Sequence, residues 1–207
     1  MRSGNRFVPP IKSYILFFKP YGVLSQFTKE KGHDALCDFG PFPKGYYAAG
    51  RLDADSEGLL FITNDNAVQH RLTDPKFGHE RSYLVQVEGI PEKDNLKRLR
   101  NGIIIEGKRT KPALIELLNA EPKIPPRSAP IRVRKNIPTP WLKMTLREGR
   151  NRQVRKMTAA VGHPTLRLVR TSIVFLTLEG LSPGQHRTLR SEEIKKLFHI
   201  LQLPYAS

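Results

Sequence analysis

The sequence predicts an α+β fold, because segments with strand patterns are numerous and amphipathic helices lie between them. Residues 14–18 and 58–63 are short apolar runs, which are typical of buried strands. Residues 81–88 alternate, so that Tyr83, Val85 and Val87 fall on one face of a strand. A chain of 207 residues is long enough to bury a core in one domain or in two small lobes.

The remaining elements are assigned from periodicity, capping residues and chain breakers. Further strands are predicted at residues 46–49, 103–106, 113–118 and 141–146, near Leu166 and Leu168, and at 173–178, with a basic turn at 108–111. Helices are predicted at residues 34–39, at 66–72, from Pro91 to Asn101, and from within 148–157 to Gly162. Ser191 is expected to cap a last helix whose apolar stripe is Ile194, Leu197, Phe198 and Leu201.

Two stretches depart from these patterns. Residues 1–12 are basic and contain two adjacent prolines, so we expect a flexible arm before a domain at residues 13–207. Prolines also interrupt residues 119–140, which carry several basic side chains, and proline is excluded from helix interiors and central strands. This segment is predicted to be a long loop that either contacts phosphates or acts as a solvated hinge. The overall charge favours phosphate contact.

The net charge of +16 indicates a polyanionic partner, most often nucleic acid. Solubility alone, or a structural protein of the ribosomal type, would give the same balance. Cys37 is the single cysteine, which excludes an intramolecular disulfide and a Cys-based zinc site. The sequence shows neither the apolar core of a secretory signal nor a run of roughly 20 apolar residues. We therefore expect a cytoplasmic protein without a membrane segment.

The stretch at residues 50–65 combines a charged turn with a buried strand, and rigid scaffolds often present catalytic groups in this way. Arg51, Asp53, Asp55, Ser56 and Glu57 crowd the turn. The alternative is that these carboxylates are solvated or capping groups, as most acidic turn residues are.

Three motifs of this chain resemble those of the RsuA-type bacterial pseudouridine synthases, and they occur in the family order. Gly-Arg-Leu-Asp-x-x-Ser-x-Gly-Leu-Leu at residues 50–60 matches the signature whose Asp is catalytic, here Asp53. Arg-Ser-Tyr-Leu-Val at 81–85 matches the second motif and aligns its tyrosine with Tyr83. Glu-Gly-Arg-Asn-Arg-Gln-Val-Arg-Lys-Met at 148–157 resembles the third, in which an arginine, here Arg155, reaches the catalytic Asp.

The resemblance covers nearly all of residues 14–198, and Lys-Pro-x-Gly-Val-Leu-Ser at 19–25 resembles the opening of the family's catalytic domain. Most members carry an S4-type RNA-binding domain before this point. Its absence points to the E-type branch, which acts on large-subunit rRNA. One departure lies at residues 171–174, where members usually show an Ile-Gly pair, and there we expect altered packing with retained activity.

The resemblance implies a mixed, mainly antiparallel sheet with flanking helices, in two lobes around a cleft that holds Asp53. It also implies a monomeric enzyme that needs no cofactor or metal and isomerises a uridine of 23S rRNA. The rivals are a sibling synthase with another rRNA target, and a non-catalytic RNA-binding or ribosome assembly factor. The cations expected to contact RNA are Arg51, Arg132, Arg134, Lys135, Arg150, Arg152 and Lys156.

The expected chemistry fits these residue types. Isomerisation breaks the N1–C1′ bond, turns the base and rejoins it through C5. Attack on C1′, addition to C6 and removal of the 2′ proton all require an ionised carboxylate, and a facing Arg155 would favour that form of Asp53. Tyr83 would offer a flat face for an extruded base and is a candidate for removing the C5 proton. The alternative for Tyr83 is an ordinary core aromatic.

Overall fold

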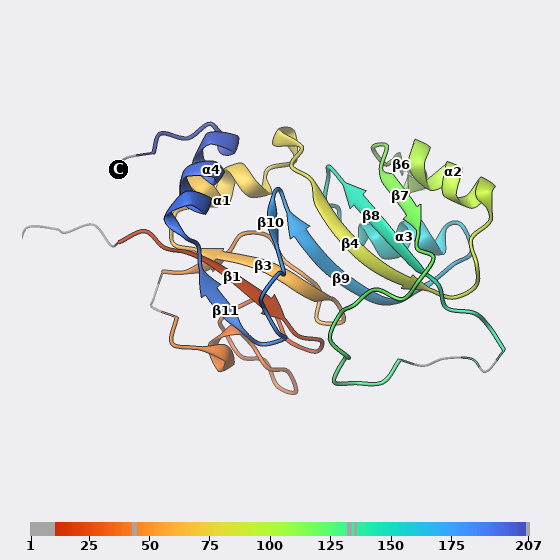
Figure 1. Cartoon of the computed structure of the whole chain (residues 1–207), viewed down its shortest axis with the longest axis horizontal. Coiled ribbons are helices and arrows are strands. Elements are labelled where there is room, and N and C mark those ends of the chain that lie inside the picture. The colour runs from red at the N-terminus through yellow and green to blue at the C-terminus, as the bar shows by residue number, and fades with distance from the viewer. Residues whose placement is uncertain (1–10, 43–44, 132–133, 135, 206–207) are drawn as a thin grey trace, which may run out of the picture.

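The computed structural model describes residues 11–42, 45–131, 134 and 136–205. Within them, a nine-stranded sheet runs through the molecule in the order β11-β1-β3-β9-β4-β8-β7, with β2 paired to β3 and β10 paired to β9 (Figure 1). Every pairing in this sheet is antiparallel except that of β3 with β9. The prediction of a mixed, mainly antiparallel α+β fold is therefore confirmed.

The sheet has two halves that meet at the parallel pair. The first half holds β1 (Tyr14–Lys19), β2 (Tyr47–Ala48), β3 (Glu57–Thr63) and β11 (His186–Thr188). The second half holds β4 (Arg81–Val87), β7 (Leu114–Leu117), β8 (Trp141–Leu146), β9 (Thr165–Ile173) and β10 (Leu176–Thr177). A separate hairpin pairs β5 (Ile104–Ile105) with β6 (Lys108–Arg109).

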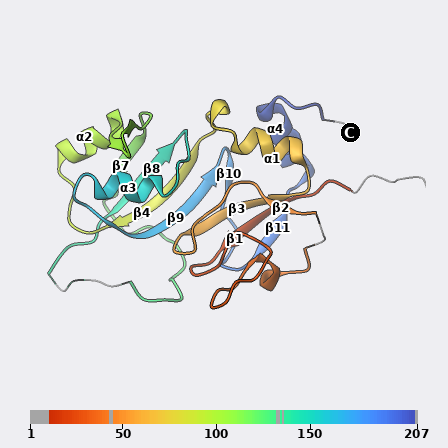
Figure 2. The same ribbon diagram turned by 180° about the vertical axis from the view of Figure 1, so that it is seen from behind.

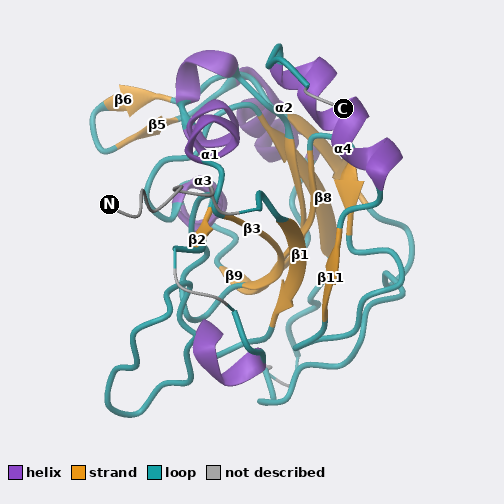
Figure 3. Cartoon of the chain, turned by 90° about the vertical axis from the view of Figure 1, so that its left-hand side faces the viewer, coloured by secondary structure: helices purple, strands orange, loops and turns teal. Residues whose placement is uncertain are grey.

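Helices cover each half separately. Helices α1 (Asn66–Thr73) and α4 (Ser191–Leu201) lie together over the first half, and α2 (Lys93–Asn101) and α3 (Gln153–Ala159) lie over the second (Figures 1 and 2). Viewed along the length of the molecule, α1 and α3 lie on the same side of the curved sheet (Figure 3). Short 3-10 helices occupy Leu36–Phe39 and Pro75–Phe77.

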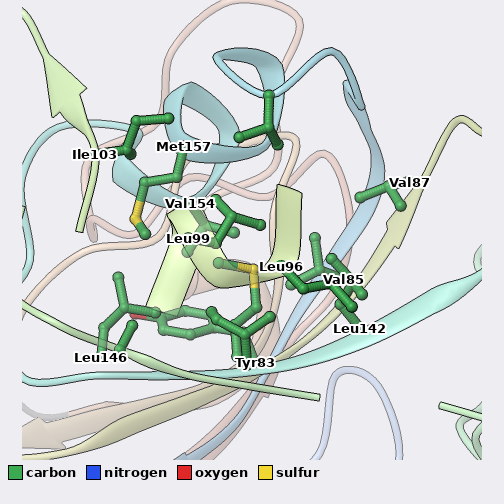
Figure 4. Close-up of a cluster of buried hydrophobic side chains, with 14 of the residues drawn as sticks. Tyr83, Val85, Val87, Leu96, Leu99, Ile103, Leu142, Leu146, Val154 and Met157 are labelled. Atoms are coloured by element: carbon green, nitrogen blue, oxygen red, sulfur yellow. The ribbon is translucent and has the colours of Figure 1, made fainter. Parts of the chain in front are cut away.

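The apolar core is divided in the same way. One cluster joins β4, β8, α2 and α3 in the second half, and it includes Val85, Leu99, Leu142 and Met157 (Figure 4). A second joins β1 and β3 to α1 and α4, and a third packs Phe17, Leu36 and Leu60 beneath the segments that precede β3. These separate cores give the fold two lobes joined through a continuous sheet.

The seam between the lobes rests on a close approach of two backbones. Only Glu57 with Val169 and Gly58 with Arg170 pair in the parallel stretch of β3 and β9. A Cβ atom at Gly58 would lie 2.2 Å from the carbonyl oxygen of Arg170, and the residue has a φ of +111°. Any larger residue would separate the strands here, so glycine is required.

Four local predictions need correction. Helix α2 begins at Lys93 and not at Pro91, and α4 is preceded by Arg190 as its N-cap, so Ser191 does not cap it. The carboxylate of Glu193 reaches back to the Arg190 N–H at 2.8 Å and satisfies that helix end instead. Lys108 and Arg109 belong to a strand, because the turn falls one step earlier, at Glu106 and Gly107. Val174, with a φ of 57°, divides the predicted 173–178 strand into the end of β9 and β10.

Residues 119–131, 134 and 136–140 contain neither helix nor strand, as predicted for this loop. The loop is nevertheless attached to the sheet. The Arg167 guanidinium donates to the Pro125 carbonyl at 2.8 Å, and that of Arg127 lies 4.1 Å from the ring centre of Tyr21. Of the predicted arm, residues 1–10 lie outside the described chain, whereas Lys12 forms an ion pair with Asp65 at 2.9 Å.

Candidate active site

Asp53 lies in a tight turn directly before β3. The N–H of Ser56 donates to the Asp53 carbonyl at 3.0 Å and closes the turn, while every residue of the strand that follows is buried. The Asp53 side chain remains 35% exposed. A rigid buried strand therefore presents this carboxylate at the surface of a cleft.

Ser25 braces the turn from a neighbouring segment. Its hydroxyl donates to the Leu52 carbonyl at 2.8 Å and accepts from the Leu52 N–H at 3.0 Å. The N–H of Gly22 donates to the Ala54 carbonyl at 2.7 Å. Sequence reasoning placed Ser25 and Gly22 in a family motif without giving them a role. Their partners lie some thirty residues away, and no local pattern identifies such partners.

Lys19 lies beneath the same turn and is fully buried. Its ammonium group donates to the carbonyls of Val23 at 2.6 Å and Pro20 at 2.9 Å, and reaches that of Ala54 at 3.5 Å. Burial lowers the pKa of Lys19 to about 7, although the charges of Glu57, Asp55 and Asp53 oppose the shift. The lysine thus ties the loop after β1 to the turn that carries Asp53.

The arginine that reaches Asp53 is Arg152. Its guanidinium lies 3.3 Å from the Asp53 carboxylate and donates two hydrogen bonds to Asp55, at 2.8 and 3.2 Å. Burial raises the pKa of Asp55, but the hydrogen bonds from Arg152 and the charges of Arg155 and Arg152 outweigh it and hold this pKa below its ordinary value. One planar cation therefore bridges both carboxylates of the turn.

Arg152 directly precedes α3 and is not part of the helix. It is the N-cap of the helix, and its φ of 50° and ψ of 32° are left-handed. Such a backbone is uncommon for a residue other than glycine, and it directs this side chain toward Asp53 instead of along the helix. The periodicity of the sequence contains no signal for a single left-handed residue.

Arg155 was predicted to pair with Asp53, and the structure differs from this prediction. Its guanidinium donates to the Asp55 carbonyl at 2.7 Å, approaches the Asp55 carboxylate at 3.4 Å and lies 3.4 Å from the Ser56 hydroxyl. The side chain is only 14% exposed. Burial lowers its pKa, and the charge of Asp55 opposes this shift. Arg155 therefore contacts the turn at Asp55 and Ser56, and not at Asp53, the partner predicted for it.

A buried polar pair shapes the loop that carries Arg152. The Gln153 amide donates to the Glu148 carboxylate at 2.6 Å and accepts from the Arg150 N–H at 2.9 Å. The same Glu148 oxygen accepts from the Lys111 N–H at 2.9 Å. Both side chains are buried, and the pair closes residues 148–153 into a defined loop. Glu148 and Gln153 were read only as part of a motif, so their structural role was missed.

Tyr83 faces both the core and the cleft. It is 9% exposed and belongs to the cluster of the second lobe, where its ring lies beside Leu146 (Figure 4). It also lines the cavity above Asp53. The ring thus packs as a core aromatic and also lines the cavity, and its role toward a base stays a prediction.

These groups surround one cavity of about 700 Å³. Its polar lining includes Ser25, Asp53, Tyr83 and Arg152, and its apolar lining includes Leu52, Leu146, Val154 and Leu168. The four polar residues come from both lobes, so the cavity lies across the seam between them. A volume of this size is within the usual range of small-molecule sites and accommodates a nucleoside.

The other predicted RNA-binding cations are placed differently. Arg51 lines the cavity, and its side chain makes no hydrogen bond or ion pair with any residue that the structure describes. Arg150 lines it too, but its guanidinium donates to the carbonyls of Lys108 and Arg109. Lys156 pairs with Glu106 at 2.6 Å, and Arg134 pairs with Glu88 at 3.3 Å. Arg132 and Lys135 lie outside the described residues.

No group of three or more His, Cys, Asp or Glu side chains within residues 11–42, 45–131, 134 and 136–205 is arranged to hold a metal ion. Over the same residues, none of the helices is both long and apolar enough to cross a membrane.

Comparison with known proteins identifies the family. Residues 13–160 match the family described as RNA pseudouridylate synthase. The chain belongs to this family. A solved structure described as a crystal structure of pseudouridylate synthase superimposes with a TM-score of 0.75 at 30% identity, and the match covers 90% of this chain and 74% of the other.

Curated relatives of the synthase are also similar over most of their length. The ribosomal large subunit pseudouridine synthase E of Xanthomonas axonopodis pv. citri is 51% identical over 82% of this chain and 90% of that protein. The enzyme of the same name from Vibrio parahaemolyticus is 50% identical over 86% of this chain and 74% of its own. The ribosomal large subunit pseudouridine synthase B of Bacillus subtilis is 38% identical, over 89% and 70% respectively.

Proposed function

We propose that this pseudouridine synthase isomerises a uridine of 23S rRNA, the RNA of the large ribosomal subunit. The observation that carries the proposal is the cavity across the seam, in which Asp53, Arg152 and Tyr83 converge. The relatives named as large-subunit enzymes E, at about half identity over most of the chain, support the choice of substrate. The net charge of +16 suits a polyanionic partner.

Each residue at the cavity has a role in this proposal. Asp53 supplies the reactive carboxylate, and Arg152 orients it. The ring of Tyr83 stacks on the target base after the base leaves its neighbours, and its hydroxyl is the candidate for taking up the C5 proton. Arg155 and Lys19 hold the turn on which Asp53 lies. The reaction requires no redox change, because the same base is detached and rejoined.

The site is assembled within a single chain, since every group named above belongs to the same protomer. We therefore expect a monomer to be active. Arg51 lies at the cavity with its charge available, so we assign it to a phosphate that flanks the target nucleotide. Modification of ribosomal RNA also places the protein in the cytoplasm.

Release of tritium tests the proposed activity. Large-subunit rRNA labelled with tritium at C5 of its uridines, and isolated from cells that lack the gene, is incubated with the protein. A synthase releases tritium to water, because C5 exchanges its hydrogen for the bond to C1′. The uridine that reacts is then located by mapping pseudouridines in the same RNA.

Two controls separate the rivals. Small-subunit rRNA labelled in the same way reports a sibling target, since a synthase for that subunit would release tritium only there. A non-catalytic assembly factor would bind both the RNA and its precursor particles without releasing tritium from either. Retained binding with no release from any rRNA would overturn the proposal.

A further inference from the structure

A second cavity of about 500 Å³ lies beside the catalytic one. Its lining is dominated by aromatic rings, and it also includes the single cysteine of the chain. The aromatic residues are Phe27, Phe42, Tyr46 and Tyr47. None of the four lines the cavity at Asp53, and none belongs to the family motifs of the sequence.

The two cavities are adjacent. Ser25 and Arg51 line both of them, so a strand of nucleic acid that leaves the catalytic cavity on this side passes Arg51 and reaches the aromatic one. Among the residues that the structure describes, no Asp or Glu lines the aromatic cavity. Beyond Arg51, a phosphodiester backbone therefore meets no carboxylate from the described lining of the aromatic cavity.

The rings are arranged partly to pack and partly to remain accessible. Phe27 and Phe42 lie edge to face with their ring centres 5.4 Å apart, and both pack on the third core cluster. Tyr47 differs, because it lies on the two-residue edge strand β2 and is 54% exposed. A large aromatic ring left exposed beside a concave apolar wall forms a stacking platform with a vacant partner position.

We propose that this cavity binds an unpaired base of the RNA strand that carries the target uridine, stacked on Tyr47. The proposal rests on the function proposed above, and it names a second contact by which the enzyme holds its substrate. Stacking on aromatic side chains is the usual way in which proteins hold unpaired bases. Arg51, between the two cavities, contacts the phosphate that links the two nucleotides.

A base fits the site better than a peptide or an apolar metabolite does. An apolar ligand would favour a closed cavity, whereas Tyr47 in the lining of this one is 54% exposed and two of its lining residues also line the cavity at Asp53. A peptide on the edge strand β2 would have only two residues with which to pair. The sharing of Ser25 and Arg51 by the two cavities therefore favours the substrate strand itself.

Fluorescence of a base analogue tests the proposal. The probe is an RNA of about nine residues, within the usual length of a single-stranded site, with one uridine among cytidines and one 2-aminopurine at a single flanking position. The protein is Asp53→Asn, which keeps the cavities and leaves the uridine unreacted. We expect strong quenching of 2-aminopurine at one flanking position and weak quenching at the others.

Variants of Tyr47 decide which ring is responsible. In the Asp53→Asn background, Tyr47→Ala should abolish the position-specific quenching and weaken binding about 5- to 150-fold, the range measured for loss of one stacked base. Tyr47→Phe should retain both. The matched control is Tyr205→Ala, which removes another exposed tyrosine that lies against Phe198 and not at either cavity. It should leave the quenching unchanged.

Cys37 gives a second readout that needs no fluorophore. It is exposed and lines the aromatic cavity, so bound RNA should slow its alkylation by N-ethylmaleimide. Equal alkylation with and without RNA, or quenching that persists in Tyr47→Ala, would overturn the inference. Because both readouts measure binding alone, their failure is distinct from a failure to release tritium, which would contradict the proposed activity.

Discussion

The guanidinium of Arg152 lies 3.3 Å from the carboxylate of Asp53, whereas that of Arg155 lies against the carbonyl of Asp55 at 2.7 Å. The two arginines of one motif therefore have separate positions. Arg152 is at the cleft and about 40% exposed, and Arg155 is buried beneath the turn. This separation makes their effects on rate and on stability distinguishable.

Replacing Arg152 should impair catalysis without destabilising the fold. Arg152→Met removes the cation that bridges Asp53 and Asp55, and we expect kcat to fall about a hundredfold, as it does when a reacting group is misplaced. The free energy of unfolding should change by about 1 kcal/mol or less, because the pair is partly exposed. Single-turnover tritium release and urea denaturation measure the two quantities.

Arg155→Met is the matched comparison. It leaves the Asp55 carbonyl without this donor in a partly buried place, so we expect a loss of about 1–3 kcal/mol in the free energy of unfolding. If Arg155→Met instead lost rate at full stability while Arg152→Met retained its rate, the contact predicted from the sequence would form when RNA binds.

Asp53→Asn should abolish turnover and leave RNA affinity and thermal stability nearly unchanged. The amide preserves the shape of the side chain and removes the charge that the chemistry requires. Filter binding to labelled rRNA and tritium release measure affinity and rate on the same preparation. Retention of even a few percent of the wild-type rate would exclude Asp53 as the reactive group.

Tyr83→Phe should bind RNA normally and react more slowly. Phenylalanine fills the same place in the core of the second lobe and keeps the face for stacking, but it has no hydroxyl to accept a proton. Tyr83→Ala is uninformative, because removal of a core ring costs about 3–5 kcal/mol of stability. A wild-type rate in Tyr83→Phe would limit this residue to stacking.

The sequence predicted the fold well where the pattern is local or repeated. The buried strands at 14–18 and 58–63 and the alternating strand at 81–88 were found close to their observed limits. It failed where one backbone angle decides the outcome, as at Val174, which interrupts a continuous apolar run with a φ of 57°. A β-branched residue in that conformation has no signature in hydrophobic periodicity.

The candidate site shows the same division. Asp53 and Tyr83 were assigned through family motifs, and the structure brings both to one cavity. Which arginine reaches Asp53 depends on the left-handed backbone of Arg152, and which groups hold the turn depends on Ser25 and Lys19. Those contacts join segments that are far apart in sequence, so only the tertiary structure reveals them.

The loop at residues 119–140 should contribute to RNA binding through phosphate contacts. Replacing Arg132, Arg134 and Lys135 with Ala should weaken binding and flatten its salt dependence by about 0.7 to 0.9 log unit per lost contact. The ion pair of Arg134 with Glu88 is compatible with this role, since the Arg134 side chain is 66% exposed and such pairs contribute little.

Arg147→Ala is the matched control for the loop. Arg147 is equally exposed and also pairs with a glutamate, Glu80, but it lies outside the loop. It should leave the slope of affinity against salt unchanged. An unchanged slope in the triple variant as well would make the loop a hinge and not a phosphate-binding segment.

Lys19 should make stability depend on pH in a definite direction. Its pKa is lowered to about 7 in the folded protein, against 10.5 as the ordinary value, so between these limits the unfolded chain binds more protons. The free energy of unfolding should therefore rise with pH over this window, by at most about 1.4 kcal/mol per pH unit, and become flat on either side of it. Lys19→Met removes the titrating group, so the difference between the wild type and this variant isolates the effect from other groups.

Urea denaturation of both proteins from neutral pH to about pH 10 measures that difference, and Lys143→Met, which removes an exposed lysine on β8, is the matched control. We expect wild type and Lys143→Met to have parallel curves, and Lys19→Met to lack the rise. Lys19→Met should also be less stable at every pH, because the carbonyls of Val23, Pro20 and Ala54 lose their common donor. Parallel curves for all three proteins would mean that the ammonium group keeps its ordinary pKa in the fold, and that Lys19 holds the catalytic turn as a permanent cation.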